Sequence, residues 1–439
     1  MTTTMPNHDS LTPQEASYIA HNAYFTLKDW ISGQPVIGME TRANVKKMVT
    51  GDGRGANVAA GHTNTSLKST PLAGAKLDRV FAGSTAGVST GFGYVLSYNR
   101  GGMKQVVIAT RGTRAEQGKA DIFTDLRGSL TTFGGFGQVH HGFKNTFDSV
   151  KIGLARDEAR IMDADAVHVV GHSLGGAVAT LVAAHFSSRG KAVKLYTFGC
   201  PRVGALGAQY AMESSLGKEN IYRVSHDLDP VTMVAPYPYG HLNGLDTDAN
   251  NMMLVSPTGR LLSVANHDMN EYVRSVGDPE MSWGAVRALG GAVDRDNAVV
   301  ARWLLRSSDN PGWLTQKAAQ GLTYLIKAFS HFLKAAGFAA IAGLTAIDLF
   351  AVMLSSNLTK MAEMNAELME CIRQAAGWAR IVITGAAQIT ATVIRGILNA
   401  MMSVLRPLAT QALTKVGGGG VPLPLILAGA AALAGTVIA

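Results

Sequence analysis

The stretch that decides the fold is AVHVVGHSLGGAVATLVAAHF, residues 166–186. Residues 166–170 are apolar and largely β-branched, which predicts a strand, and the Ala-rich residues 177–186 predict a helix. Between them, Gly171–Gly176 contains a G-x-S-x-G pattern centred on Ser173. A strand, a sharp turn and a helix in this order are the setting of a nucleophile elbow, which raises the serine hydroxyl above the sheet edge and turns the helix N-terminus toward it. The flanking elements disfavour the alternative of a chance Gly-Ser turn.

Predicted strands and helices alternate along the rest of the first 285 residues. Strand-like runs cover residues 91–99, 104–110, 193–198 and 221–225, with a short extended piece at 261–265, and helical patterns cover residues 13–28 and 145–160 and begin again at 268. This alternation predicts an α/β fold with a mostly parallel central sheet and helices on both faces. Residues 33–75 are rich in Gly, Thr, Asn and Ser and show no lasting period, so no regular element is expected there.

The length of the chain is enough for two or three domains, and its composition is basic. The chain has 439 residues, with 39 Lys and Arg against 31 Asp and Glu, a net charge of +8. That excess suits a membrane or a nucleic acid without choosing between them. Its two cysteines, Cys200 and Cys371, are far apart and imply no disulfide scaffold. The lack of a disulfide scaffold fits a reducing site of synthesis. Residues 1–12 are polar and lack the apolar core of a Sec signal peptide, so we expect a disordered tail and no Sec signal.

Residues 286–439 differ from residues 13–285, the expected α/β domain, because their pattern is helical and unusually apolar. Residues 335–355 carry one charge, Asp348, and residues 421–439 carry none, and both reach the length of a bilayer span. Three arrangements fit this pattern: insertion into a membrane, a helical layer packed on the α/β domain, or a segment kept soluble by a partner until delivery. We expect a membrane-interacting region.

A serine nucleophile needs a base to take its proton and a third group to orient that base. Asp227 and Asp229 both follow a predicted strand at its C-terminal end, where α/β sheets place functional residues. His267, at the junction of an extended piece and a helix, is the expected base, and His241 is its rival. His172 is adjacent in sequence to the nucleophile and is therefore badly placed to act on it.

The oxyanion that forms during such chemistry needs N–H donors. One is expected from the backbone of Leu174, directly after the nucleophile. The second is expected from Thr113, which follows a predicted strand and Arg111-Gly112. This chemistry requires neither a cofactor nor a metal ion.

Five segments together carry a resemblance to a known family. They are Arg111–Thr113 (R-G-[ST]), Val139–Phe143 (V-H-x-G-F), Gly171–Gly176 (G-H-S-L-G-G), Tyr196–Gly204 (Y-T-[FY]-G-x-P-R-V-G) and Asp229–Thr232 (D-x-V-P). The chain resembles the class 3 lipases, the fungal-lipase-like branch of the α/β-hydrolases, over residues 13–285. The resemblance implies that Ser173 is the nucleophile, that Asp229 rather than Asp227 is the acid, and that His267, in an H-x-x-x-x-Y segment, is the base.

The chain also departs from this family. Thr110 precedes R-G-[ST] where an aromatic residue is common, and Thr232 stands in the acid motif where the family has Pro. The signal peptide and disulfides of the secreted fungal members are not expected here. By the same resemblance residues 114–125 form the lid, and their polar, partly cationic side chains favour an anionic or zwitterionic headgroup.

The resemblance implies a lipase or phospholipase, a carboxylic ester hydrolase that works through an acyl-enzyme. We expect membrane phospholipids as substrate, cut in the manner of a phospholipase A, with triacylglycerol as the alternative substrate. A membrane-inserting toxin or scaffold with an inactive hydrolase fold is the alternative function. The domain layout is similar to that of bacterial lipase effectors delivered by type VI secretion. This similarity implies synthesis in a bacterial cytoplasm, export by a specialised system, membrane association, a secretion carrier or chaperone, and an immunity protein. We expect no nucleic-acid partner.

Overall fold

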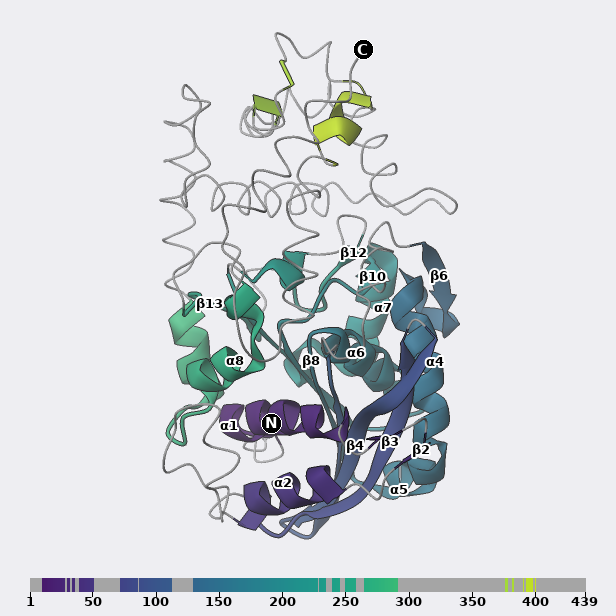
Figure 1. Ribbon diagram of the computed structural model, residues 1–439, viewed down its shortest axis with the longest axis vertical. Helices are drawn as coiled ribbons and strands as arrows, with labels where there is room; N and C mark the ends of the chain where they lie inside the picture. Colours follow the sequence, from purple (N-terminus) through teal and green to yellow (C-terminus); the bar gives the residue numbers. More distant parts are fainter. Residues whose placement is uncertain are drawn as a thin grey trace, which may run out of the picture.

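The computed structural model shows an α/β domain (Figure 1). The residues it describes are 10–27, 30–31, 34–35, 39–50, 72–85, 87–112, 129–227, 229–233, 239–244, 249–257, 264–290, 376–377, 381–382, 390, 392–397 and 399.

Seven strands of the described residues form the main sheet, in the order β13-β11-β9-β8-β5-β4-β3. They are β3 (Lys76–Thr85), β4 (Val88–Arg100), β5 (Met103–Thr110), β8 (Ala166–His172), β9 (Val193–Phe198), β11 (Ile221–His226) and β13 (Asn251–Leu254). The pairs from β13 to β5 are parallel, and β4 and β3 join antiparallel at one edge. The predicted α/β fold with a mostly parallel sheet is confirmed.

Helices cover both faces of this sheet. They are α1 (Pro13–Asn22), continued by the 3-10 helix η1 (Ala23–Leu27), α2 (Met39–Thr50), α4 (His141–Leu154), α5 (Glu158–Asp163), α6 (Leu174–Ser187), α7 (Leu206–Leu216) and α8 (Met269–Val276). Figure 1 shows α1 and α8 together on one side of the sheet and α4 on the other. A parallel sheet buried on both faces needs this arrangement, since neither face can be left to water.

Two hydrophobic cores meet at the central strand β8. Val167 and Val169 belong to the core beneath α4 and α6, whereas Val170 belongs to the core beneath α1 and α8. Successive side chains of a strand point to opposite faces, so each core receives every second residue. The strand that leads to Ser173 is therefore fixed from both sides.

Shorter elements complete the domain. They are β1 (Trp30–Ile31), β2 (Gln34–Pro35), β6 (Leu130–Phe133), η5 (Gly134–Phe136), β7 (Gly137–His140), η6 (Ala155–Asp157), β10 (Gly204–Ala205), η7 (Lys218–Asn220), η8 (Pro230–Met233), β12 (Tyr239–Gly240) and η9 (Val264–His267). β12, β10, β7 and β6 form a separate antiparallel sheet.

The last residues of the expected tail, residues 1–12, are packed against the domain. Leu11 is fully buried. Its backbone N–H donates to the hydroxyl of Tyr196 (2.9 Å), and the indole N–H of Trp283 donates to its carbonyl (2.7 Å). Residues 10–12 therefore lie across the sheet rather than in a tail, and residues 1–9 lie outside the described residues.

Three further differences from the expected elements stand out. The helix α2 lies in residues 33–75, where no regular element was expected. The extended piece expected at 261–265 is wrong at its end, because residues 264–267 form the 3-10 helix η9. Helical residues also continue from 283 to 290, with Val286 in the core beneath α1 and α8, so the packed domain extends past residue 285.

Most of residues 286–439 lie outside the described residues, and both span-length apolar stretches, 335–355 and 421–439, are among them. In the part of the chain that the structure describes, no helix combines the length and apolarity required to cross a bilayer.

Candidate active site

The turn after β8 holds Ser173 in a backbone conformation that side chains rarely adopt. Its φ is 61° and its ψ is −132°, and it is the residue directly before α6. The turn closes only because its neighbours lack side chains. A Cβ on Gly171 would lie 2.3 Å from the carbonyl oxygen of Gly175, and a Cβ on Gly175 would lie 2.4 Å from that of Thr110. A strained conformation of this kind costs on the order of 1–3 kcal/mol and is typical of functional sites.

The structure brings Ser173, His267 and Asp229 into one line of hydrogen bonds. The Ser173 Oγ lies 2.8 Å from Nε2 of His267, and Nδ1 of His267 lies 2.8 Å from Oδ2 of Asp229. All three side chains are buried, each at the C-terminal end of the parallel strands or in the loops that follow them. Since a carboxylate only accepts, Nδ1 carries the proton, and the bare Nε2 accepts from the serine hydroxyl.

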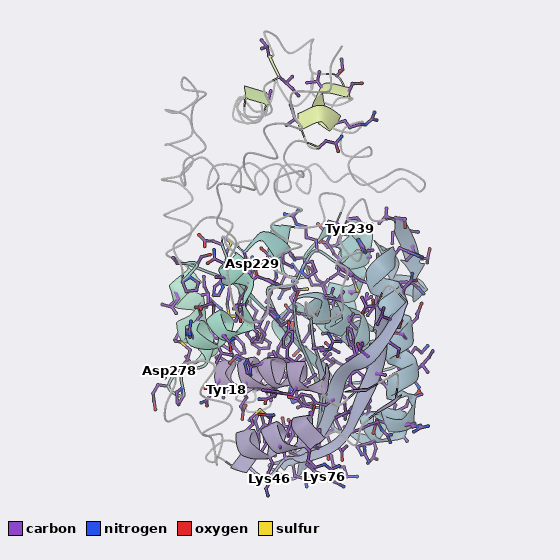
Figure 2. All side chains as sticks on the ribbon, viewed as in Figure 1. Tyr18, Lys46, Lys76, Asp229, Tyr239 and Asp278 are labelled. Carbon is purple, nitrogen blue, oxygen red and sulfur yellow. The ribbon has the colours of Figure 1, made fainter. Side chains whose placement is uncertain are left out.

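Asp229 is held by donors on both of its oxygens. Its Oδ1 accepts from the backbone N–H of Val231 (2.8 Å), and its Oδ2 also accepts from the hydroxyl of Tyr272 (2.6 Å). Figure 2 shows Asp229 at the end of the domain opposite Lys46 and Lys76. The carboxylate is therefore pinned in the orientation that faces His267.

The hydroxyl of Tyr272 is the second support of Asp229. Burial, followed by the neighbouring Asp229, raises the pKa of Tyr272 well above its ordinary value, so the hydroxyl keeps its proton and donates. The same hydroxyl accepts from the backbone N–H of His226 (3.0 Å). The imidazole ring of His226 stacks on the phenol ring of Tyr272, with the ring centroids 4.0 Å apart. The H-x-x-x-x-Y spacing contains this tyrosine, but the motif predicts no role for its hydroxyl.

The rival residues have other partners. Asp227 accepts from the backbone N–H and the hydroxyl of Ser256 through Oδ1 (2.9 and 2.6 Å), so it ties together two loops. His241 lies 2.8 Å from the carbonyl of Thr232 through Nε2. His172 lies 2.9 Å from the backbone carbonyl of His267, again through Nε2. None of these four contacts includes the hydroxyl of the nucleophile.

The backbone opposite the triad has room only for glycine. Gly199, after β9, has a φ of 53°. A Cβ there would lie 2.8 Å from Oδ2 of Asp229 and 3.0 Å from Nδ1 of His267. This residue stands in the Tyr196–Gly204 motif, and its close approach to the acid and base accounts for the glycine at that position.

The oxyanion donors are described in part. Leu174 is the first residue of α6, so its N–H has no partner within the helix and stands beside Ser173. Thr113, the second expected donor, and the expected lid, residues 114–125, lie outside the described residues. Gly112 is the last described residue of this loop. A Cβ on Gly112 would lie 2.7 Å from the Cβ of Ser173, so the loop reaches the nucleophile.

A buried arginine holds that loop in place. The Arg111 guanidinium donates to the carbonyls of Gly91 and Gly112 and to the Thr90 hydroxyl, each at 2.6 Å, and lies 5.5 Å from the centroid of the Phe92 ring. The R-G-[ST] motif contains this residue, but its fixing of the Gly112 carbonyl was not predicted. Among the described residues, no cluster of three or more His, Cys, Asp and Glu side chains could hold a metal ion.

Comparisons with known proteins agree with the motifs. Residues 107–238 match the family described as lipase (class 3). A secreted mono- and diacylglycerol lipase 1 of Fusarium solani is 33% identical over 176 residues, which are 37% of this chain and 48% of the relative. A phospholipase A1-II 4 of Oryza sativa subsp. japonica is 28% identical over 228 residues, 45% of this chain and 56% of the relative. The chain thus spans about half the length of these curated relatives.

Among solved structures, the mono- and diacylglycerol lipase of Aspergillus oryzae is 24% identical, with a TM-score of 0.33, over 40% of this chain and 66% of that one. The strand order described above, with a nucleophile elbow after a central parallel strand, independently defines the fold. Residues 107–238 therefore match the class 3 lipases, within a domain whose sheet and nucleophile elbow are those of the α/β-hydrolase fold.

Proposed function

We propose that this chain hydrolyses acyl ester bonds of lipids through a serine acyl-enzyme. The observation that carries the proposal is the unbroken line of 2.8 Å hydrogen bonds from Ser173 through His267 to Asp229. A triad is recognised by this geometry and not by sequence position. The intact line also favours an enzyme over a scaffold with an inactive hydrolase fold.

The mechanism follows from the protonation of the triad. Ser173 attacks the acyl carbonyl while Nε2 of His267 takes its proton, and Asp229 stabilises the imidazolium that forms. The N–H of Leu174, with Thr113 as the second donor, holds the oxyanion. His267 then returns the proton to the departing alcohol. A water molecule, activated by the same imidazole, releases the fatty acid and restores the serine hydroxyl.

A short-chain nitrophenyl ester tests this activity without a membrane. The wild type is expected to release nitrophenolate, and Ser173→Ala to lose at least about 10³-fold in kcat. Ser188→Ala, which removes an exposed hydroxyl at the other end of α6, is the matched control and keeps full activity. Equal rates for Ser173→Ala and the wild type contradict the proposal.

The finer proposal is that the substrate is a membrane phospholipid, cut as a phospholipase A cuts it. One curated relative is named a phospholipase A1 and another a mono- and diacylglycerol lipase, so the relatives are named for phospholipids and for acylglycerols. The polar residues at 114–125 support the phospholipid. Mass spectrometry of products from phospholipid vesicles and triacylglycerol emulsions decides: lysophospholipid with fatty acid supports the proposal, and diacylglycerol alone supports the alternative substrate.

We also propose that residues 286–439 bring the hydrolase to a membrane. The apolar stretches 335–355 and 421–439 support this. Full-length protein is expected to float with phospholipid vesicles in a density gradient. Leu344→Lys combined with Leu433→Lys places a charge in each stretch, at a cost of about 3 kcal/mol per charge in a bilayer, and should abolish flotation.

The proposed setting is a bacterial effector, exported by a specialised system with a carrier and an immunity protein. The domain layout supports this proposal. Expression in a bacterial periplasm is expected to arrest growth, and Ser173→Ala to remove the arrest. Full toxicity of Ser173→Ala would instead favour the membrane-inserting toxin.

A further inference from the structure

The catalytic histidine is held by its backbone as well as by its ring. His172, the residue before the nucleophile, lies with Nε2 2.9 Å from the backbone carbonyl of His267. The two imidazole rings also lie 4.6 Å apart between centroids, at an interplanar angle of 30°. His172 therefore touches both the peptide and the ring of the base, while its own side chain is 1% exposed.

The tautomer of His172 follows from its partners. A carbonyl oxygen only accepts, so Nε2 of His172 carries a proton and donates a hydrogen bond to the backbone carbonyl of His267. Burial, followed by the neighbouring His267, lowers the pKa of His172 well below its ordinary value, which keeps the ring neutral. Nδ1 is then a bare acceptor. The hydroxyl of Tyr24 donates to it at 2.5 Å.

Tyr24 comes from the far N-terminal part of the domain. It lies in η1, the continuation of α1, and is buried. One turn earlier, His21 lies 3.0 Å from the Asn270 amide oxygen through Nε2, and Asn270 is in the first turn of α8. The α1–η1 segment thus reaches His267 through His172, and it contacts Asn270, three residues further along, directly.

The same tyrosine hydroxyl lies beside the oxyanion loop. A Cβ on Gly112 would lie 2.4 Å from this hydroxyl and 2.7 Å from the Cβ of Ser173. Tyr24, Gly112 and Ser173 therefore meet at one point. A displacement of Tyr24 would open a space next to the nucleophile. It would also remove the donor to His172, the residue whose Nε2–H holds the backbone carbonyl of His267.

We propose that Tyr24 and His172 are positioning residues for His267: Tyr24 donates to His172 Nδ1, and His172 Nε2 donates to the His267 carbonyl. The relay rests on the proposed ester hydrolysis, which it deepens, and it makes the α1–η1 segment part of the active site. Neither residue touches the reacting atoms. Their effect is to hold the imidazole on the line from Ser173 to Asp229, where a misplacement of about 1 Å costs on the order of 10²-fold in rate.

The test compares tyrosine-to-phenylalanine changes at two buried sites. Tyr24→Phe removes the donor to His172. Tyr94→Phe removes a similar buried hydroxyl, which donates to the backbone carbonyl of Ile19 in α1 (2.9 Å) without contacting the triad. With a short-chain ester, Tyr24→Phe is expected to lower kcat about 10- to 100-fold with KM within about twofold, and Tyr94→Phe to leave both unchanged. Equal losses of kcat in both variants overturn the proposal.

A second pair of variants tests the carbonyl contact. His172→Gln places an amide N–H as many bonds from Cβ as the Nε2–H of histidine, so it can still donate to the His267 carbonyl, whereas His172→Leu cannot. We expect His172→Gln to recover at least about tenfold of the kcat lost in His172→Leu at similar melting temperature. Equal kcat values for the two variants overturn the proposal.

The relay also has a readout that needs no substrate. In ¹⁵N-histidine NMR spectra of the full chain, His172 is expected as the Nε2–H tautomer, with the Nδ1 signal of an unprotonated acceptor that shifts in Tyr24→Phe. An Nδ1–H tautomer in the wild type overturns the relay. If the wild-type protein does not hydrolyse the ester, the proposed function is overturned instead. The tautomer of His172 shows in either case whether the two hydrogen bonds of the relay exist.

Discussion

At the scale of single residues, the triad depends on a missing side chain as much as on its three members. Gly199→Ala would place a methyl group 2.8 Å from Oδ2 of Asp229 and 3.0 Å from Nδ1 of His267, at a φ of 53°. We expect kcat to fall at least about 100-fold, because the acid and base must separate. Steady-state kinetics on a short-chain ester measures the loss.

The control is Gly190→Ala, at a φ of 84° with nothing within 4 Å of its added Cβ. It bears the same kind of backbone strain, about 1 kcal/mol, without a clash. It should lower the free energy of unfolding slightly and leave kcat unchanged. A comparable loss of kcat in both variants would show that strain, rather than contact with the triad, matters at Gly199.

The two candidate acids, Asp229 and Asp227, have different hydrogen-bond partners, so their substitution should have different effects. Asp229→Asn is expected to lower kcat about 10⁴-fold, since an amide favours the wrong tautomer of His267. Asp227→Asn, whose partner is Ser256, should leave kcat within about twofold and affect only the free energy of unfolding. Kinetics and denaturant unfolding of both variants check this, and a full loss of activity in Asp227→Asn contradicts the assignment.

The residues alone could not choose between these aspartates. Both follow the same strand two positions apart, and the direction of each carboxylate depends on the turn that carries it. The D-x-V-P resemblance selects Asp229, and the structure places that residue beside His267. His172, Tyr24 and Arg111 act through hydrogen bonds between distant segments, which no local pattern encodes.

At the scale of elements, α1 matters because it leads to Tyr24. It begins with a capping box, in which the Thr12 hydroxyl accepts from the backbone N–H of Glu15 and the Glu15 carboxylate accepts from the backbone N–H of Thr12. Thr12→Ala is expected to lower the free energy of unfolding by about 1 kcal/mol, measured by denaturant unfolding. Thr12→Ser keeps the hydroxyl and should stay within about 0.3 kcal/mol of the wild type. Similar losses in both variants would show that the cap contributes little.

The elements around the elbow were predicted closely because their patterns are strong. β8, α6 and β9 fall on the expected residues, and the 91–110 hairpin appears as β4 and β5. α2 was missed because its buried residues Val45, Met48 and Val49 form only a short period within a polar stretch. β3 was missed because it is a half-exposed edge strand whose register shifts twice, which leaves little alternation to detect.

At the scale of the whole molecule, buried neutral histidines make the fold sensitive to acid. Burial lowers the pKa of His168 to about 3, and that of His172 and His226 below the ordinary value. In the unfolded chain these groups titrate near pH 6.5, so below that pH the unfolded state binds more protons. Stability is therefore full above about pH 6.5 and falls as the pH drops, by at most about 1.4 kcal/mol per pH unit for each such histidine.

Denaturant unfolding between pH 8 and pH 4.5 measures this slope. His168 is the clearest contributor, since its ring lies between the Gln105 side chain and the hydroxyl of Tyr196 far from the triad. His168→Gln is expected to reduce the acid slope by close to one proton. An unchanged slope would contradict the assignment of His168 as a buried neutral group.

The overall architecture was predictable, since it follows from the order of elements, whereas the docking of the N-terminal segment was not. That docking rests on hydrogen bonds such as the one between Leu11 and Trp283, which are 272 positions apart. Contacts of such large separation leave no local signal in the sequence.

The bond from Trp283 to Leu11 has a consequence for biosynthesis. A ribosome that adds roughly 5–20 residues per second releases residue 11 some tens of seconds before residue 283. For most of that interval the carbonyl of Leu11 has no indole donor, and α8 (Met269–Val276), which packs against α1, has not been made. The docking of α1 is therefore completed late in translation, when His267 of the proposed triad has also been made.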